Sequence, residues 1–248
     1  MKTYSCRVCD NALFFENSEC VSCGTTLAYS RHEQDIVPLD DGTGTYTDGA
    51  GCTWHRCRNF EIAGCTWLAP VASGQCFACD PTRTRPSDSD TVGMASFLPA
   101  ESAKRHLIVE LDALGFAVVA KKDDPANGLC FDLLSSTDEP VTTGHANGVV
   151  TIDLAEANNA HREYVRALLE EPYRTMLGHF RHEVGHYFEW QLVENGAAHV
   201  LARARELFGD ETADYQETID RHYVNRCALT TLVPLARMAG CDSRSFGP

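Results

Sequence analysis

The chain has 248 residues, of which 44% are hydrophobic, the usual share for a globular protein, so a largely disordered chain is excluded. No stretch of about 18 apolar residues occurs and the chain turns polar soon after its start, so we expect a soluble, cytoplasmic protein that does not bind membranes. The formal net charge of −14 repels phosphate, which makes nucleic acid a poor candidate partner.

Cysteines are the most informative feature of the composition, because nine of the twelve lie between Cys6 and Cys79. In a cytosolic chain such crowding is typical of metal binding rather than of disulfides. The segments "CRVC" and "CVSC" are Cys-x-x-Cys knuckles, and two knuckles can surround one tetrahedral zinc with four thiolates. The predicted ligands are Cys6, Cys9, Cys20 and Cys23. A redox dithiol, which needs only one such pair, is the weaker alternative.

A second cysteine cluster follows a polar, glycine-rich stretch at 40–51 and contains a third knuckle, "CFAC". The predicted ligands of a second structural zinc are Cys57, Cys65, Cys76 and Cys79. Cys52 is then the odd cysteine, and His55 is an alternative ligand. Each zinc would stabilise segments too short to bury a core, so we predict a zinc-ribbon module over 1–85. Zinc ribbons can bind nucleic acid, which stays a minor alternative against the acidic charge.

Beyond this module, the segment 81–90, "PTRTRPSDSD", is predicted to be a linker because it is rich in proline, serine and charge. The second domain, 86–248, begins with apolar residues at helical spacing in "ESAKRHLIVELDALGF", so we expect a helix that ends at Gly115. Strands are expected in "FAVVA", "LCFDLL" and "GVVTIDL", the last opened by an Asn-Gly turn. From 155 almost to 223 the pattern is helical. The predicted fold class is α+β, with a mostly helical domain and a small sheet after the zinc ribbon.

One long helix is expected to carry the chemistry, because Pro172 suits its first turn and Gly196 suits its end. Within it "HEVGH" places His182 and His186 at positions i and i+4 on one face, where two imidazoles can bind one zinc ion. Glu183 is then the predicted general base on a water that the zinc activates, a chemistry that hydrolyses peptide or amide bonds. The alternative is that the two histidines are packed core residues.

The segments "TGHANGVVTIDLAEAN", "EEPYRTMLGHFRHEVGHYFEW" and "LFGDETADYQETIDRHY", together with the cysteine pattern, resemble a family of bacterial zinc-ribbon proteins classed as zinc-binding metallopeptidases. The resemblance covers 6–223. It implies a gluzincin-like hydrolase with a zincin-like fold, His182 and His186 as zinc ligands and Glu183 as general base. It also implies the second cysteine ligand set given above, with Cys52 outside it.

The chain departs from this family at about residue 224. Family members continue with a helix of the Glu-Asp-x-x-Glu-Thr-x-x-His kind, expected to supply the third zinc ligand, whereas the tail here has no Glu and no His. A catalytic zinc normally needs three protein ligands. The substitute candidates are Glu206, Glu211, Asp214 and His222. With a third ligand, we expect a zinc metallopeptidase that acts on a peptide or protein; without one, a zinc-ribbon adaptor that has lost catalysis.

Overall fold

The computed structural model describes residues 2–137, 139–168 and 174–209. The chain divides into two compact units, Met1–Asn195 and Gly196–Pro248. The first unit contains the cysteine-rich region followed by helices and a small sheet, so the predicted α+β class is confirmed. Among the described residues, no helix combines the length and the apolar character that a membrane span requires.

Short antiparallel strands build the cysteine-rich region. They pair as β1 (Tyr4–Ser5) with β2 (Ala12–Leu13), β3 (Leu27–Ser30) with β4 (Asp35–Pro38), and β6 (Thr53–Arg56) between β5 (Thr45–Thr47) and β7 (Leu68–Ala69). The strand β3 is buried along its whole length, and its Tyr29 packs on Trp67 with ring centroids 4.7 Å apart. A small aromatic core therefore supports the knuckles.

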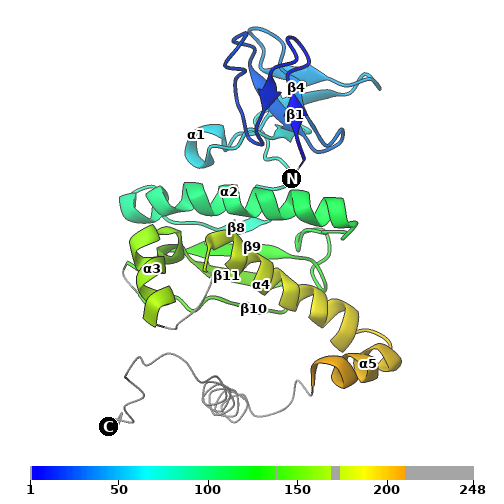
Figure 1. The fold of residues 1–248 in the computed structure, drawn as a ribbon, viewed down its shortest axis with the longest axis vertical. Helices are drawn as coiled ribbons and strands as arrows, with labels where there is room; N and C mark the ends of the chain where they lie inside the picture. Colours follow the sequence, from blue (N-terminus) through cyan, green and yellow to red (C-terminus); the bar gives the residue numbers. More distant parts are fainter. Residues whose placement is uncertain (1, 138, 169–173, 210–248) are drawn as a thin grey trace, which may run out of the picture. The chain divides into compact units, whose positions relative to one another are not determined.

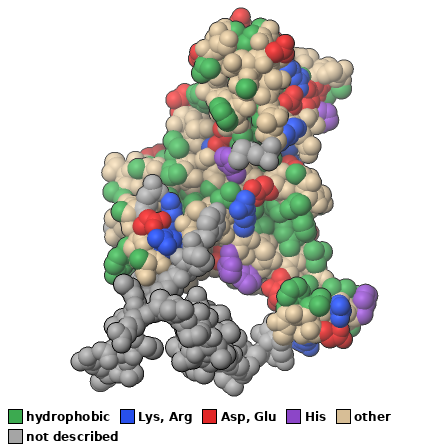
Figure 2. All heavy atoms as spheres, viewed as in Figure 1, with side chains coloured by type: hydrophobic (Ala, Val, Ile, Leu, Met, Phe, Trp, Pro, Cys, Tyr) green, Lys and Arg blue, Asp and Glu red, His purple; other side chains and the backbone are tan. Residues whose placement is uncertain are grey.

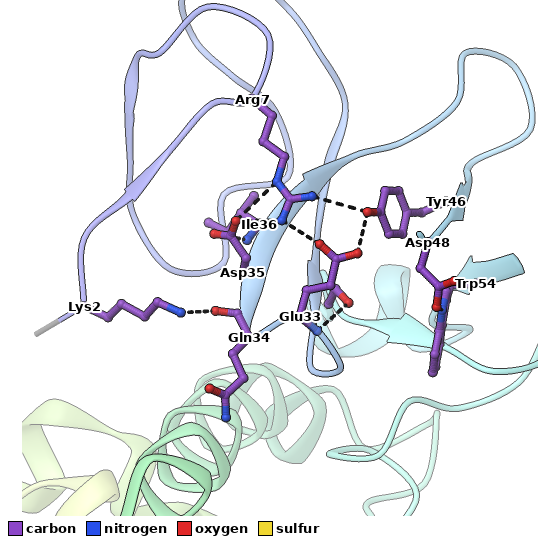
Figure 3. A network of polar contacts seen from close by, with 10 residues as sticks. Lys2, Arg7, Glu33, Gln34, Asp35, Ile36, Tyr46, Asp48 and Trp54 are labelled. Atoms are coloured by element: carbon purple, nitrogen blue, oxygen red, sulfur yellow. Dashed lines mark hydrogen bonds and ion pairs between the residues drawn. The ribbon is translucent and has the colours of Figure 1, made fainter. Parts of the chain in front are cut away.

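An arginine of the first knuckle, Arg7, forms hydrogen bonds with residues of β4, of β5 and of the turn between β3 and β4 (Figure 3). Arg7 donates hydrogen bonds to Glu33 and Asp35, each at 2.7 Å, and to the Tyr46 hydroxyl at 3.3 Å. Tyr46 in turn donates to Glu33 at 2.5 Å. Because these side chains are partly exposed, each ion pair contributes only about 0–1 kcal/mol, and the main effect of the network is to orient the knuckle on β3 and β4.

The helix α2 (Thr91–Leu114) lies between the cysteine-rich region and the sheet (Figure 1). Asp90 caps its start, and Gly115 ends it in the left-handed backbone region, as predicted. Towards the cysteine-rich region, Arg105 donates a hydrogen bond to the carbonyl of Ala63 at 3.1 Å. On its other side, α2 contacts the sheet and the helix that carries the histidines.

The sheet of the first unit has four strands in the order β10-β11-β9-β8. These are β8 (Thr82–Thr84), β9 (Cys130–Leu134), β10 (Gly144–Ala146) and β11 (Val149–Asp153). The strand β9 is parallel to both of its neighbours, whereas the edge strand β10 is antiparallel to β11. Asn147 and Gly148 join β10 to β11 with φ values of 49° and 77°, the signs that a type I′ hairpin turn requires.

Two segments differ from the prediction, whereas β9 and β11 confirm it. The predicted linker at 81–90 contains β8, because polar and proline-flanked residues are tolerated at the edge of a sheet. The strand predicted at 116–120 is wrong, since only a single bridge forms there, at Ala120. Phe116, at the start of this segment, packs on α4, where its ring centroid lies 4.6 Å from that of Phe188.

The predicted long helix is present as α4 (Met176–Glu189), which continues as a π-helical turn at Trp190–Glu194. Thr175 caps its start by accepting a backbone hydrogen bond. The predicted end at Gly196 is close to the observed one, and the predicted first-turn residue Pro172 lies outside the described residues. The other helical segments are α1 (Phe60–Ala63), η1 (Leu154–Ala157), α3 (Asn159–Leu168) and, in the second unit, α5 (Ala198–Phe208).

One continuous hydrophobic cluster connects the parts of the first unit. It includes Trp67 of the cysteine-rich region, Ile108 of α2, Phe131 of β9 and Phe180 of α4, all fully buried. The cysteine-rich region and the sheet therefore share one core through α2. The domain boundary between residues 85 and 86 stays a prediction from the sequence.

Candidate metal centres and active site

The first four predicted cysteine ligands meet at one point, with every Sγ within 4.8 Å of the others. The Sγ of Cys6 lies 3.8 Å from that of Cys23, and the Sγ of Cys9 lies 3.6 Å from that of Cys20. Two sulfurs bound at about 2.3 Å to one tetrahedral zinc would be about 3.8 Å apart, so this set fits the ion. The Thr25 hydroxyl lowers the pKa of Cys23 to about 6, which favours the thiolate that zinc binds.

The second predicted set also comes together and is wholly buried: Cys57, Cys65, Cys76 and Cys79. The Sγ atoms of Cys65 and Cys76 are 3.5 Å apart, and the Sγ of Cys57 accepts the backbone N–H of Cys76 at 3.3 Å. Of the alternatives, neither Cys52 nor His55 belongs to the cluster formed by the described residues. The geometry fits a second tetrahedral zinc held by four sulfurs.

Buried charged side chains of α2 lie beside this second cluster. Glu101 and Lys104 are fully buried, and their Oε1 and Nζ atoms are 2.5 Å apart. The Sγ of Cys79 lies 3.7 Å from Oε2 of Glu101, and the Thr82 hydroxyl donates to Oε1 at 2.7 Å. Burial raises the pKa of Glu101 above its usual range. The buried pair of Glu101 and Lys104 could not be predicted from the sequence, because an isolated Glu or Lys on a helix is usually solvated.

The two predicted histidine ligands lie side by side on α4. Their Nε2 atoms are 3.1 Å apart, and two nitrogens bound at about 2.0–2.1 Å to one tetrahedral zinc would be about 3.3 Å apart. Both His182 and His186 are exposed, which does not fit the alternative of packed core histidines. Figure 2 shows histidine side chains at the surface of the face that α4 crosses. The pair is therefore open to an ion and to a substrate.

One carboxylate contacts this pair, and another lines the same pocket. Glu183 is buried, with 7% of its surface exposed, and lines the same pocket as His186. The Nδ1 atom of His186 lies 3.4 Å from Oε2 of Glu189, a contact that leaves Nε2 free to bind a metal. His179, one turn earlier, lies 3.2 Å from Oε2 of Glu156, and this contact holds α4 against η1.

A pocket of about 490 Å³ opens between α4 and the edge strand β10. Its lining comprises Thr143, Gly144, His145, Ala146, Asn147, Glu183, His186, Glu189, Trp190 and Glu194. His145 was not among the residues predicted from the sequence; its pKa is lowered chiefly by burial, and further by electrostatic interaction with His186 and Lys121. A larger pocket of about 620 Å³, lined in part by His32 and Trp54, contains none of the predicted catalytic residues.

No third ligand joins His182 and His186 in the part of the chain that the structure describes. The candidate Glu206 lies in α5 of the second unit, where its carboxylate pairs with Arg203 at 2.7 Å. The other candidates lie outside the described residues: Glu211, Asp214 and His222. The third ligand therefore stays a prediction.

Residues 94–230 match a protein family described as "Putative zinc-binding metallo-peptidase", and residues 3–90 match a zinc-ribbon domain family. Uncharacterized proteins of Mycobacterium tuberculosis and Mycobacterium bovis are 45% identical to the chain over 225 residues. These matches cover 90% of the chain but only 63% of each relative, so the chain spans less than two thirds of the curated relatives' length. No solved structure matches the chain.

Proposed function

Because the chain belongs to the family described as putative zinc-binding metallo-peptidases, we propose that it is a zinc-dependent hydrolase of a peptide or amide bond. The observation that supports this most strongly is the histidine pair on α4. The Nε2 atoms of His182 and His186 lie 3.1 Å apart, at a pocket that His186 and Glu183 both line. Two imidazole ligands beside a carboxylate supply two of the three protein ligands of a catalytic zinc and a candidate general base.

Each part of the site then has a chemical role. Zinc held there would polarise the carbonyl of the substrate and lower the pKa of a water molecule to about 7. Glu183 would accept a proton from the attacking water and pass it to the leaving nitrogen. Only 7% of Glu183 is exposed, so few other water molecules compete for its oxygens.

The edge strand β10 (Gly144–Ala146) supports a peptide as the substrate. Among the described strands it pairs only with β11, so its second edge can form hydrogen bonds with an extended peptide. The same strand lines the pocket that contains Glu183. We therefore propose that the substrate is a peptide or protein segment in an extended conformation.

The two cysteine clusters are proposed to hold structural zinc ions. Four sulfur ligands complete a tetrahedral zinc and leave no position for a substrate. The third ligand of the histidine site is proposed to come from Glu206, Glu211, Asp214 or His222. A second candidate function is a zinc-ribbon adaptor without catalysis, motivated by the tail from about residue 224, which has no Glu and no His.

The test is cleavage of a broad peptide library by the zinc-loaded protein, followed by mass spectrometry. We expect the wild type to cleave, and Glu183→Gln to lower kcat by about 10²–10⁴-fold at unchanged zinc content, because only the proton transfer is removed. Glu163→Gln, which changes an exposed carboxylate of α3, is the matched control and should keep full activity. Cleavage by Glu183→Gln at the wild-type rate would refute the proposal, and a zinc-loaded wild type that cleaves nothing would favour the adaptor.

A further inference from the structure

A histidine on the sheet faces the same pocket as the histidine pair on the helix. We propose that His145 binds the substrate directly, by donating a hydrogen bond from its Nδ1–H group to a carbonyl oxygen of the bound peptide. The inference rests on the proposed function, since it assigns a contact to the same substrate at the same site.

The position of His145 follows from the sheet. It is the middle residue of β10 and is paired with Val150 of β11. It lines the pocket together with Glu183 and His186 of α4. The edge strand and the helix thus contribute side chains to one cavity, and a peptide bound there would lie within reach of both.

The hydrogen bond at Nε2 determines which ring nitrogen carries the proton. The backbone N–H of Gly148 lies 3.0 Å from Nε2 of His145. An amide N–H can only donate, so Nε2 must accept, and the neutral imidazole then carries its proton on Nδ1. Neither nitrogen has a lone pair left for a metal ion. His145 is therefore a hydrogen-bond donor rather than the third zinc ligand.

The turn that supplies this N–H is itself held in place. The N–H of Cys130 donates to the Gly148 carbonyl at 2.8 Å, and Nζ of Lys121 donates to the Asn147 carbonyl at 2.6 Å. The turn joins two paired strands, so it cannot rotate independently of the sheet. The tautomer of His145 is thus set by the backbone before any substrate arrives.

Aromatic rings of α4 and of the π-helical turn that follows it lie beside the imidazole and restrict its orientation. The ring centroid of His145 lies 5.9 Å from that of Tyr187, at an interplanar angle of 77°, and 5.9 Å from that of Trp190. Tyr187 is anchored in turn, because its hydroxyl donates to the Asn127 carbonyl at 2.9 Å. A donor held in one orientation stabilises a developing negative charge on oxygen without first having to reorganise.

The tautomer can be measured without any substrate, by nitrogen NMR on zinc-loaded protein with labelled histidine. At neutral pH we expect a neutral ring with a proton on Nδ1 and none on Nε2 whose signal vanishes in His145→Asn, which distinguishes it from the signals of the zinc-bound His182 and His186. A proton on Nε2 of His145 would overturn the proposal, as would direct coordination of zinc by this ring.

The substrate contact is tested by kinetics on a peptide that the wild type cleaves. We expect His145→Phe, which keeps a ring but removes the donor, to lower kcat/KM about 10²-fold, mainly through kcat. His145→Asn places an amide donor near the former Nδ1 and should stay within about tenfold of the wild type. The control is His32→Phe, which changes a histidine stacked on Trp54 in the other pocket and should have no effect.

These results separate the inference from the function on which it rests. Wild-type activity in His145→Phe, while Glu183→Gln is inactive, would refute the role of His145 and leave the hydrolase standing. Loss of zinc from His145→Phe would also refute it, because the residue would then act as a ligand. A zinc-loaded wild type that cleaves nothing would refute the hydrolase and the substrate contact together, and the NMR experiment would still decide which nitrogen carries the proton.

Discussion

At the scale of single residues, the histidine site depends on the orientation of the His186 ring. Its Nε2 faces Nε2 of His182, and its Nδ1 lies 3.4 Å from the carboxylate of Glu189, three residues further along α4. A carboxylate at Nδ1 keeps the proton on that nitrogen and makes Nε2 a better ligand. Glu189 therefore supports metal binding without touching the metal.

The prediction at this scale concerns zinc affinity. We expect Glu189→Gln to weaken zinc binding at the histidine site by about 10–100-fold, because the amide holds the Nδ1 proton less strongly than the carboxylate does. Competition with a chromogenic chelator measures the affinity, and the cysteine sites should be unchanged. Glu163→Gln is the control, since Glu163 is also exposed and also paired at i,i+3, with Arg166. Equal affinity in all three proteins would contradict the role of Glu189.

Local spacing explains which site residues the sequence could predict. Residues four apart on a helix share a face, so "HEVGH" alone brings His182 and His186 together, and a Cys-x-x-Cys knuckle does the same for two sulfurs. His145 could not be predicted this way. Its place depends on the pairing of β10 with β11 and on contacts with α4, and both join segments that are distant in sequence.

At the scale of elements, the β10–β11 hairpin positions one wall of the pocket. Gly148 has a φ of 77°, and a Cβ at this residue would lie 2.2 Å from the carbonyl oxygen of Gly128. Both the backbone conformation and the lack of space thus require glycine. Gly44 also has a positive φ, of 65°, but nothing lies within 4 Å of where its Cβ would be.

These two glycines give a matched pair of substitutions. We expect Gly44→Ala to lower the free energy of unfolding by about 1 kcal/mol, through the strain of a positive φ alone. Gly148→Ala adds a steric clash with backbone and should cost about 1–3 kcal/mol more. Urea denaturation of both variants measures the difference. Equal loss of stability would show that the turn is less tightly packed than the structure indicates.

Most of the elements were predictable from their length and apolar character, but the apolar run at 116–120 forms only a single bridge. Buried runs predicted β9 and β11, and helical periodicity predicted α4 and the C-terminal part of α2. The strands β8 and β10 were missed because each has only three residues, which is too short for alternation to be recognised. The sheet edge at which we propose that the substrate binds is therefore the part that was least predictable from the sequence.

At the scale of the whole first unit, α2 links the second cysteine cluster to the sheet. Cys79 is fully buried and contacts Glu101 of α2, which pairs with Lys104. Arg105 contacts the carbonyl of Ala63 in the cysteine-rich region. Buried charges of this kind are stable only while every partner is in place. Loss of the second zinc should therefore affect the helices and the sheet as well.

This coupling predicts different effects of two cysteine substitutions. Cys79→Ser should destabilise the whole unit by several kcal/mol, on the order of 3 or more, because it removes a zinc ligand inside the shared core. Cys9→Ser should cost less, since Cys9 is exposed in a small module of two-stranded sheets. Thermal unfolding followed by far-UV circular dichroism, with zinc release recorded in parallel, measures both. The same melting temperature in the two variants would contradict the coupling.

The order of the modules could be predicted from the sequence, but their common core could not. Cysteine spacing locates the zinc ribbon, and the histidine helix locates the hydrolase-like region. The contacts that unite them, such as the hydrogen bond of 2.6 Å from Ser102 to Glu16, depend on which side chains meet across α2. No periodic pattern in the sequence predicts such contacts, because the two residues of each pair belong to segments that are far apart in the chain.

The central claim, that the histidine pair on α4 binds a third zinc ion, is tested most directly by counting zinc. Elemental analysis of the purified protein and of the His182→Ala/His186→Ala double variant gives the number of ions per chain. We expect about three zinc ions in the wild type and about two in the variant, with both cysteine sites still filled. About two in both proteins would mean that the histidine site holds no zinc, and would contradict the proposed hydrolase in favour of the adaptor.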